Sequence, residues 1–205
     1  MKNFARSLVL MVAVVMTTTV WAAATATPSA VVARLNDTLL RVMRDADKLG
    51  FEGRRKILAP VLTTVFDLPL IARASVGRYW RHLDEGQRKR LTEALARRTI
   101  ATYANRFDGY SGERFQVVSE EAAPRNTVLV KSELIKGDGE VVRFNYLLRQ
   151  NDQGWHILDV YLKGVYSQLA VRRSQYTSIL ERQGFDRLIA AIDAKTREYE
   201  TAQGS

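Results

Sequence analysis

The chain has 205 residues, a formal net charge of +9 and no cysteine. The absence of cysteine excludes a disulfide framework, a thiol nucleophile and thiolate metal ligands. The two histidines, His82 and His156, lie far apart in the sequence, so we expect neither a metal site nor another cofactor. A chain of this length without internal repeats or linkers indicates one domain.

The N-terminus has the three parts of a secretory signal peptide. Lys2 and Arg6 carry two positive charges, an apolar run follows from Leu8 to Met16, and small residues continue to Ala26. This run is shorter than the about 20 residues of a membrane-spanning helix. We therefore predict a cleaved signal peptide at 1–26 and an exported domain at 27–205; an uncleaved anchor is the alternative.

The mature chain is basic. Residues 1–26 hold two of the 31 basic residues and none of the 22 acidic ones, which leaves a charge of +7. Such a charge favours anionic partners, and export makes nucleic acid an unsuitable one. The basic residues are scattered, so solvated helix faces explain most of them.

The first half of the mature chain has the periodicity of helices. Gly50 suits the end of the first helix. Asp67 is typical of an N-cap, and Asp84 with Gln87 predicts a capping box. The predicted helices cover residues 28–50, 52–66, 68–76, 85–107, 166–183 and 185–199.

The middle of the chain changes to the period of strands. KGDGE (136–140) and QNDQG (150–154) are hairpin-type turns, so consecutive strands pair as an antiparallel meander. Helices before and after a run of strands indicate an α+β fold. The four predicted strands are Arg114–Glu120, Thr127–Ile135, Glu140–Arg149 and Gly154–Leu162.

The strands differ in the polarity of their two faces. The second and third strands alternate between apolar and polar residues, which indicates one buried face and one wet face. The last strand is apolar on both faces, with Leu158, Val160 and Leu162 on one side and Trp155, Ile157 and Tyr161 on the other. We therefore expect cover on both sides of this strand.

The sequence contains no common catalytic motif. A Gly-x-Ser-x-Gly elbow, a glycine-rich phosphate loop and HExxH are all absent. Asp159, beside Tyr161 or Tyr146, could act as a general base in an apolar cup. The alternative is that Asp159 pairs with an arginine or caps backbone amides.

Three stretches of the sequence resemble one known family. These are FDLPLIARASVGRYW (66–80), TIATYANRFDGYSGERF (99–115) and GWHILDVYLKGVYSQLAVRRSQYTSIL (154–180). With them the chain resembles the MlaC, or toluene-tolerance, family of periplasmic phospholipid-binding proteins, roughly from Val31 to Tyr199. The second and third stretches look closest to its hopanoid-associated branch, called HpnM.

This resemblance implies a fold and a function. It implies a curved, NTF2-like sheet whose flanking helices enclose an apolar lipid pocket, and a monomeric periplasmic protein without catalytic residues. The implied cargo is a phospholipid or a hopanoid-type lipid. The implied partners are an inner-membrane ABC lipid transporter complex and an outer-membrane lipoprotein complex, which together maintain the lipid asymmetry of the outer membrane.

The candidate lipid-binding residues are apolar or aromatic positions of the predicted strands and helices. Arg172 and Arg173 follow the last strand and are candidates for head-group or partner docking. Pattern alone does not distinguish a cavity lining from a solid core. The candidate lining residues are Val65, Ile71, Ala74, Trp80, Tyr103, Phe107, Val128, Val130, Leu134, Val142, Phe144, Tyr146, Leu148, Leu158, Val160 and Leu162.

Three functions from different classes are compatible with the sequence. A lipid carrier is the leading hypothesis. The second is an NTF2-like enzyme of the ketosteroid-isomerase type, with Asp159 as the base and a tyrosine as the acid. The third is an envelope protein that only docks to partners through its basic surface.

Overall fold

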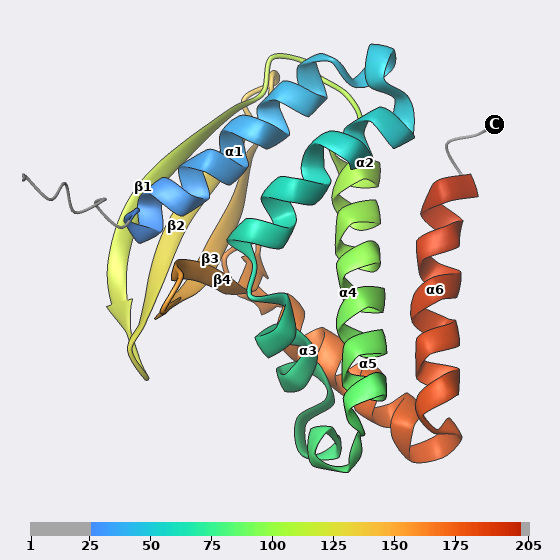
Figure 1. Cartoon of the computed structure of the whole chain (residues 1–205). Helices are drawn as coiled ribbons and strands as arrows, with labels where there is room; N and C mark the ends of the chain where they lie inside the picture. The colour runs from blue at the N-terminus through green and yellow to red at the C-terminus, as the bar shows by residue number, and fades with distance from the viewer. Residues whose placement is uncertain (1–25, 202–205) are drawn as a thin grey trace, which may run out of the picture.

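The computed structural model describes residues 26–201 (Figure 1). The predicted signal peptide, residues 1–26, lies outside the described residues except for Ala26. Within the described range, no helix is long and apolar enough to cross a membrane.

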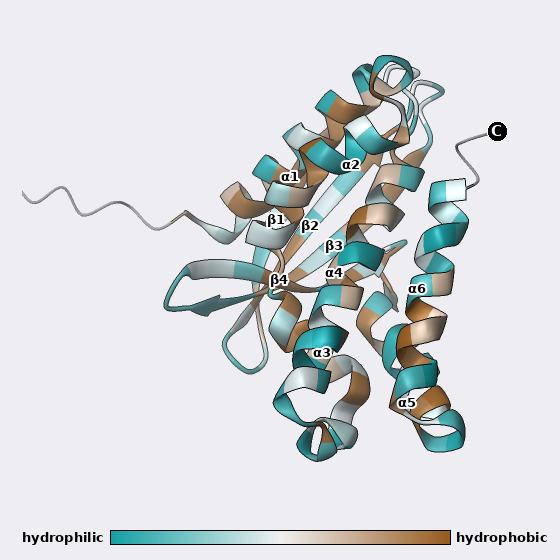
Figure 2. Ribbon diagram, turned by 45° about the vertical axis from the view of Figure 1, so that its right-hand side comes forward, coloured by the Kyte–Doolittle hydropathy of each residue, from teal (hydrophilic) through white to brown (hydrophobic). Residues whose placement is uncertain are grey.

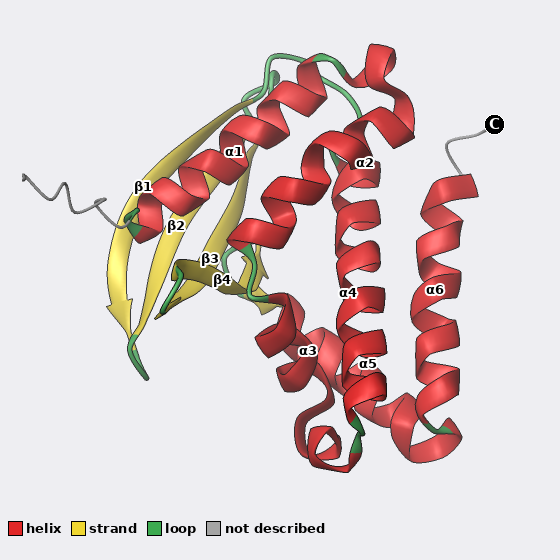
Figure 3. Cartoon of the chain, in the orientation of Figure 1, coloured by secondary structure: helices red, strands yellow, loops and turns green. Residues whose placement is uncertain are grey.

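The order of elements agrees with the predicted α+β fold. Figure 3 shows the sheet along one side of the molecule, with the helices packed on its inner face. In chain order the elements are α1 (Pro28–Arg44), α2 (Ala46–Val65), α3 (Leu68–Val76), the 3-10 helix η1 (Gly77–His82), α4 (Glu85–Arg106), β1 (Arg114–Ala123), β2 (Thr127–Ile135), β3 (Val141–Asn151), β4 (Gly154–Leu162), β5 (Tyr166–Ser167), α5 (Gln168–Gln183) and α6 (Phe185–Thr201).

The first predicted helix, 28–50, is divided by a corner. α1 ends at Arg44. The amide of Asp45 donates hydrogen bonds to the carbonyls of Arg41 and Met43, which closes the last turn. α2 then runs back along α1 (Figure 1). Gly50, with a φ of 57°, interrupts α2 near its start. The break predicted at Gly50 is therefore present, but the corner at Asp45 was not predicted.

The predicted helix caps are confirmed. The side chain of Asp67 accepts a hydrogen bond from the amide of Leu70 at 3.0 Å and begins α3. Asp84 and Gln87 form the reciprocal capping box of α4, at 2.7 and 3.1 Å. Each cap satisfies an amide that has no partner inside its helix.

The sheet is an antiparallel meander in the order β1-β2-β3-β4-β5. A short fifth strand, β5, adds to the four predicted strands. It pairs with the end of β4 through a turn in which Lys163 and Gly164 have φ values of 54° and 76°. Positive φ at both central residues is the signature of a type I′ turn. α5 therefore begins at Gln168, two residues after its predicted start.

The faces of β4 differ from the prediction because the strand contains a bulge. Val160 lies opposite Tyr146, whereas Ile157 lies opposite Leu148, so Leu158 is the extra residue. Side chains directly opposite each other project to the same face of a sheet. The prediction that Ile157 and Val160 lie on opposite faces is therefore wrong, since the bulge shifts the alternation by one residue.

α1 closes one part of the sheet's apolar face. It packs against β1, β2 and β4, and Leu35 of α1 is fully buried together with Val130 and Leu148 of the sheet. The side-chain amide of Asn36 donates to the hydroxyl of Ser132 at 3.0 Å and ties α1 to β2. Figure 2 shows hydrophobic and hydrophilic residues alternating along the helices, as expected for helices with one buried side.

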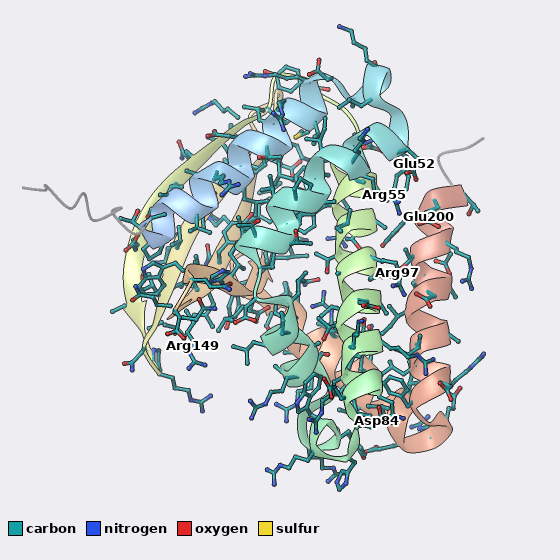
Figure 4. All side chains as sticks on the ribbon, viewed as in Figure 1. Glu52, Arg55, Asp84, Arg97, Arg149 and Glu200 are labelled. Atoms are coloured by element: carbon teal, nitrogen blue, oxygen red, sulfur yellow. The ribbon has the colours of Figure 1, made fainter. Side chains whose placement is uncertain are left out.

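α6 lies on the outer side of α4 (Figure 1). Arg97 of α4 pairs with Asp193 at 3.0 Å. Arg55 of α2 pairs with Glu52 and Glu200, each at 3.2 Å (Figure 4). Exposed pairs of this kind contribute about 0.2–1 kcal/mol each. They therefore orient α6 rather than account for its stability.

Candidate binding cavity

A cavity of about 610 Å³ lies between the sheet and helices α3, α4 and α5. This volume is within the range of about 300–1,000 Å³ that is common for small-molecule sites. The inner face of β2, β3 and β4 forms one wall, and α4 forms the facing wall. Residues predicted as lining that border this cavity are Ile71, Tyr103, Phe107, Leu134, Val142, Phe144, Tyr146, Leu158, Val160 and Leu162.

Other residues predicted as lining belong to the closed core. Val65, Val130 and Leu148 are at most 2% exposed, and Val128 packs against the same cluster. Within residues 26–201, none of these four side chains borders the cavity. They share a sheet face or a helix with the lining residues, but α1 and α2 cover their part of that face. Alternation identifies the apolar face and does not identify which part of it is covered.

Ala74 and Trp80 were also predicted as lining and do not border the cavity. Ala74 lies half-buried on α3. The ring of Trp80 packs under the guanidinium of Arg88, 5.5 Å away, and borders a smaller depression that includes Arg73 and Arg149. The 3-10 helix that holds Trp80 directs it to this outer surface.

Several lining residues were not predicted. Phe66 joins the apolar wall, and Thr99, Thr102 and Arg106 extend the α4 wall on both sides of Tyr103. Their spacing of three and four residues places them on one helix face, a signal that was available in the sequence. The rim has further polar lining residues: Asp108, Gly109, Ser111, Glu113, Lys136, Lys163 and Gln168.

A chain of aromatic rings crosses from α4 to the sheet. The ring of Tyr103 lies 5.9 Å from Phe66 and 5.7 Å from Phe107, and Phe107 lies 6.3 Å from Phe115. These separations are typical of favourable ring pairs, which contribute about 0.5–1.5 kcal/mol each beyond the area they bury. The ring chain therefore fixes the side of Tyr103 that faces the cavity.

Two tyrosines place hydroxyl groups in this apolar lining. Burial raises the pKa of Tyr103 well above its usual range, an effect that the charges of Arg106 and Arg172 partly oppose. Burial also raises the pKa of Tyr146, and the neighbouring Tyr103 raises it further. Both phenols therefore stay protonated and can donate hydrogen bonds at neutral pH.

One of the two predicted docking cations borders the cavity. Arg172 of α5 is half-buried and lines the cavity, and it forms no ion pair with a carboxylate of the described residues. Its charge also reaches Tyr176, where it partly opposes the rise in the tyrosine pKa caused by burial. Arg173 instead covers Gly77 with its guanidinium and does not border the cavity.

Asp159 has a structural role. Its carboxylate accepts hydrogen bonds from the amides of Val160 and Leu169, at 2.8 and 2.9 Å, and from the hydroxyl of Ser167 at 2.5 Å. It therefore fastens the start of α5 to β4, as the capping interpretation predicts. With three donors already bound, Asp159 is unsuited to the role of general base. Among the described residues no cluster of His, Asp or Glu could hold a metal ion.

The geometry suits a ligand with a long apolar part and an anionic or polar end. A protein-family model described as "MlaC protein" matches residues 33–194. A phospholipid-binding protein from Ralstonia solanacearum, solved with a phospholipid, has a similar fold with a TM-score of 0.73 at 18% identity. That match covers 83% of this chain and 97% of the other. The comparison with curated proteins gives no significant match.

Proposed function

The chain belongs to the MlaC family, whose model spans most of its length, and on this premise we propose that it carries one membrane lipid with the acyl chains inside the cavity. The family consists of lipid carriers and not of enzymes. Together with the hydrogen bonds of Asp159, this overturns the alternative of an isomerase that uses Asp159 as its base.

The observation that carries the proposal is an apolar cavity with a cation on its wall. Burial of an acyl chain is worth about 0.8 kcal/mol per methylene, so two chains of about 16 carbons would cost on the order of 25 kcal/mol to expose to water. A carrier must therefore replace the hydrocarbon of the bilayer with apolar wall. Arg172 adds a guanidinium, which suits the planar, charge-assisted recognition of a phosphate group.

This cation favours a phospholipid as the cargo. The structurally similar Ralstonia solanacearum protein was solved with a phospholipid, which supports the same choice. The resemblance of DVYLKGVYSQLAVRRSQY (159–176) to the HpnM branch supports a second candidate, a hopanoid-type lipid. A rigid polycycle also needs an apolar lining but has no phosphate to engage Arg172.

Native mass spectrometry of the protein isolated from its own periplasm tests this function. We expect one lipid per chain, with the mass of a phospholipid. A chain that remains lipid-free after gentle isolation would contradict the proposal, and a hopanoid mass would replace the phospholipid with the second candidate.

Arg172→Gln sharpens the test of the cargo. Loss of the charge-assisted contact should lower retention of an anionic phospholipid about tenfold, because hydrogen bonds to charged groups contribute roughly 1.5–3 kcal/mol. Arg173→Gln is the matched control, since Arg173 is on the same helix but covers Gly77. Equal retention by both variants would remove Arg172 from the head-group site.

We also propose that the carrier is exported to the periplasm and docks with its cavity rim on lipid-transport complexes of the two membranes. The sequence of the expected signal peptide supports export. Next to rim residues Lys163 and Gln168 along the chain, Val165, Tyr166 and Val171 are 69%, 62% and 48% accessible. Tyr166 lies opposite Leu162 and so on the cavity side of the sheet edge. Exposed apolar residues beside a cavity mouth suit a protein interface.

Val165→Asp tests this docking surface. We expect slower lipid transfer to an isolated partner complex with unchanged lipid content, because a buried charge would oppose docking without changing the cavity. Val118→Asp is the control, since Val118 is 54% exposed on β1, away from the rim. Equal transfer rates for both variants would place the docking surface elsewhere.

A further inference from the structure

Two hydroxyl groups interrupt the apolar wall of the cavity at facing positions. Tyr146 projects from the middle of β3, between Phe144 and the closed core, and Tyr103 projects from α4 on the opposite wall. Both side chains border the same cavity, and Tyr103 adds to the rise in the pKa of Tyr146 that burial causes. An apolar chain cannot form a hydrogen bond with either hydroxyl.

Neither hydroxyl has a hydrogen-bond partner within residues 26–201. Tyr146 is 2% exposed. Its hydroxyl oxygen has no partner in this part of the chain, but it is not fully enclosed by protein atoms. Since Tyr146 lines the cavity, its small accessible area includes the hydroxyl oxygen, and that oxygen faces the cavity. A polar group left unpaired in apolar surroundings is costly, so these groups call for an acceptor from the ligand.

The chemistry of the two phenols limits them to donation. Burial raises the pKa of both tyrosines, so neither becomes a phenolate under physiological conditions. A protonated phenol surrounded by hydrocarbon donates to a neutral acceptor such as a carbonyl oxygen. The anionic part of a ligand has a better partner in the guanidinium of Arg172.

The cavity also holds cations beside these neutral donors. Arg106 and Arg172 line it together with both tyrosines, and their charges partly oppose the rise in the pKa of Tyr103 that burial causes. Apolar lining surrounds Tyr146 on the sheet, since Val160 lies opposite it and Phe144 and Leu162 form the next pair on the same face. The lining therefore combines cations, neutral donors and hydrocarbon wall. A diacyl glycerophospholipid has the complementary groups: a phosphate, ester carbonyls and alkyl chains.

We propose that the hydroxyls of Tyr103 and Tyr146 form a subsite that donates hydrogen bonds to the ester carbonyl oxygens of a diacyl glycerolipid. This inference rests on the lipid-carrier function and adds a chemical selectivity to it. The subsite recognises the ester linkage between the glycerol and the acyl chain, and not the head group. A dialkyl ether lipid has the same chains and phosphate but no carbonyl, so it leaves both donors unpaired.

The first measurement needs no variant. The full chain, stripped of lipid, is mixed with equal amounts of a diacyl phosphatidylglycerol and its dialkyl ether analogue in detergent micelles, and native mass spectrometry gives the ratio of the bound lipids. We expect the ester lipid to be preferred at least fivefold, given two hydrogen bonds that each change affinity about two- to tenfold. Equal uptake of the two lipids would overturn the proposal.

The second measurement assigns the preference to the tyrosines. Tyr103→Phe and Tyr146→Phe keep the rings and remove the hydroxyls, and we expect the double variant to bind the two lipids equally while binding of the ether lipid stays unchanged. Tyr110→Phe is the matched control, because Tyr110 is 42% exposed and its ring packs against Arg44 outside the cavity lining. An ester preference that survives in the double variant would refute the subsite.

Failure of the carrier function gives a different result from failure of the subsite. Uptake of neither lipid by the wild-type chain contradicts both proposals. Uptake of both lipids without preference contradicts the subsite alone and leaves the carrier function intact. Thermal unfolding of each variant verifies that the rings still pack, so a change in the lipid ratio reports on the hydroxyls.

Discussion

The apolar row along β3 lies partly in a closed core and partly on the wall of a cavity. Leu148 is fully buried, and its neighbour on β2, Val128, packs against the same core. Phe144 and Val142 lie on the same face of the same strand and line the cavity. We refer to these two parts as the closed half and the hollow half of the sheet.

The difference between the halves comes from what covers them. α1 and α2 pack on the closed half, where Leu35 and Leu62 fill the space above the sheet. The hollow half faces α4 and the start of α5 at a distance that leaves a cavity of about 610 Å³. Identical residue types therefore contribute to stability in one half and are available for binding in the other.

Truncation of matched leucines should give the largest difference between the halves. We expect Leu148→Ala to lower the free energy of unfolding by about 2–5 kcal/mol, because it opens a void in a packed core. Leu162→Ala enlarges an existing cavity and should cost only about 1 kcal/mol. Urea denaturation of the lipid-free proteins measures both. Equal losses would mean that the two halves are packed alike.

Substitution of Asp159, which holds the start of α5 to the hollow half of the sheet, should have the next largest effect. Asp159→Ala removes three hydrogen bonds, two of which join β4 to the start of α5, and we expect a loss of about 1.5–3 kcal/mol in the free energy of unfolding. Asp159→Asn keeps one acceptor and should lose less. The same denaturation experiment tests this order, and a neutral Asp159→Ala would contradict the capping role.

Added volume should have opposite effects in the two halves. Val160→Phe fills part of the cavity, so we expect a gain of about 0.5–2 kcal/mol in stability together with loss of bound lipid. Val130→Phe adds the same volume to the closed half and should cost about 1–3 kcal/mol. Thermal melts and native mass spectrometry report the two quantities. A Val160→Phe chain that still carried lipid would count against the cavity as the binding site.

The smallest effect is absent at neutral pH and appears in alkaline solution. Burial raises the pKa of Tyr103 and Tyr146 in the folded chain, whereas the unfolded chain ionises near the usual value of about 10. The unfolded state therefore binds fewer protons above that pH, and stability falls as pH rises. The double Tyr→Phe variant should lose less stability between pH 9 and pH 11 than wild type, by roughly 1 kcal/mol for each phenol. Identical pH profiles would show that neither phenol is buried.

Much of the fold could be predicted because its signals are local. The predicted bounds of α3, β2 and β4 agree with the structure, and so do the caps at Asp67 and Asp84. Each depends on residues within one turn or one strand. The bulge at Leu158 could not be predicted, because it is defined by the pairing of β4 with β3 and not by β4 alone.

The candidate site divides in the same way. Spacing along α4 and β3 placed Tyr103, Phe107 and Tyr146 on apolar faces, and in the structure all three border the cavity. Spacing did not separate Arg172 from Arg173, which are adjacent in sequence but have different surroundings. Their difference depends on α3, which brings Gly77 under Arg173.

The sequence by itself determined most of the elements, the caps and the apolar face of the sheet, since these follow from the short-range periodicity of helices and strands. Only the tertiary structure decided that part of this face stays open, with both Tyr103 and Tyr146 on the wall of the opening. The physical reason is that a cavity is a mismatch between a surface and its cover, and it arises where α1 no longer covers the sheet. No pattern within a single segment encodes that mismatch.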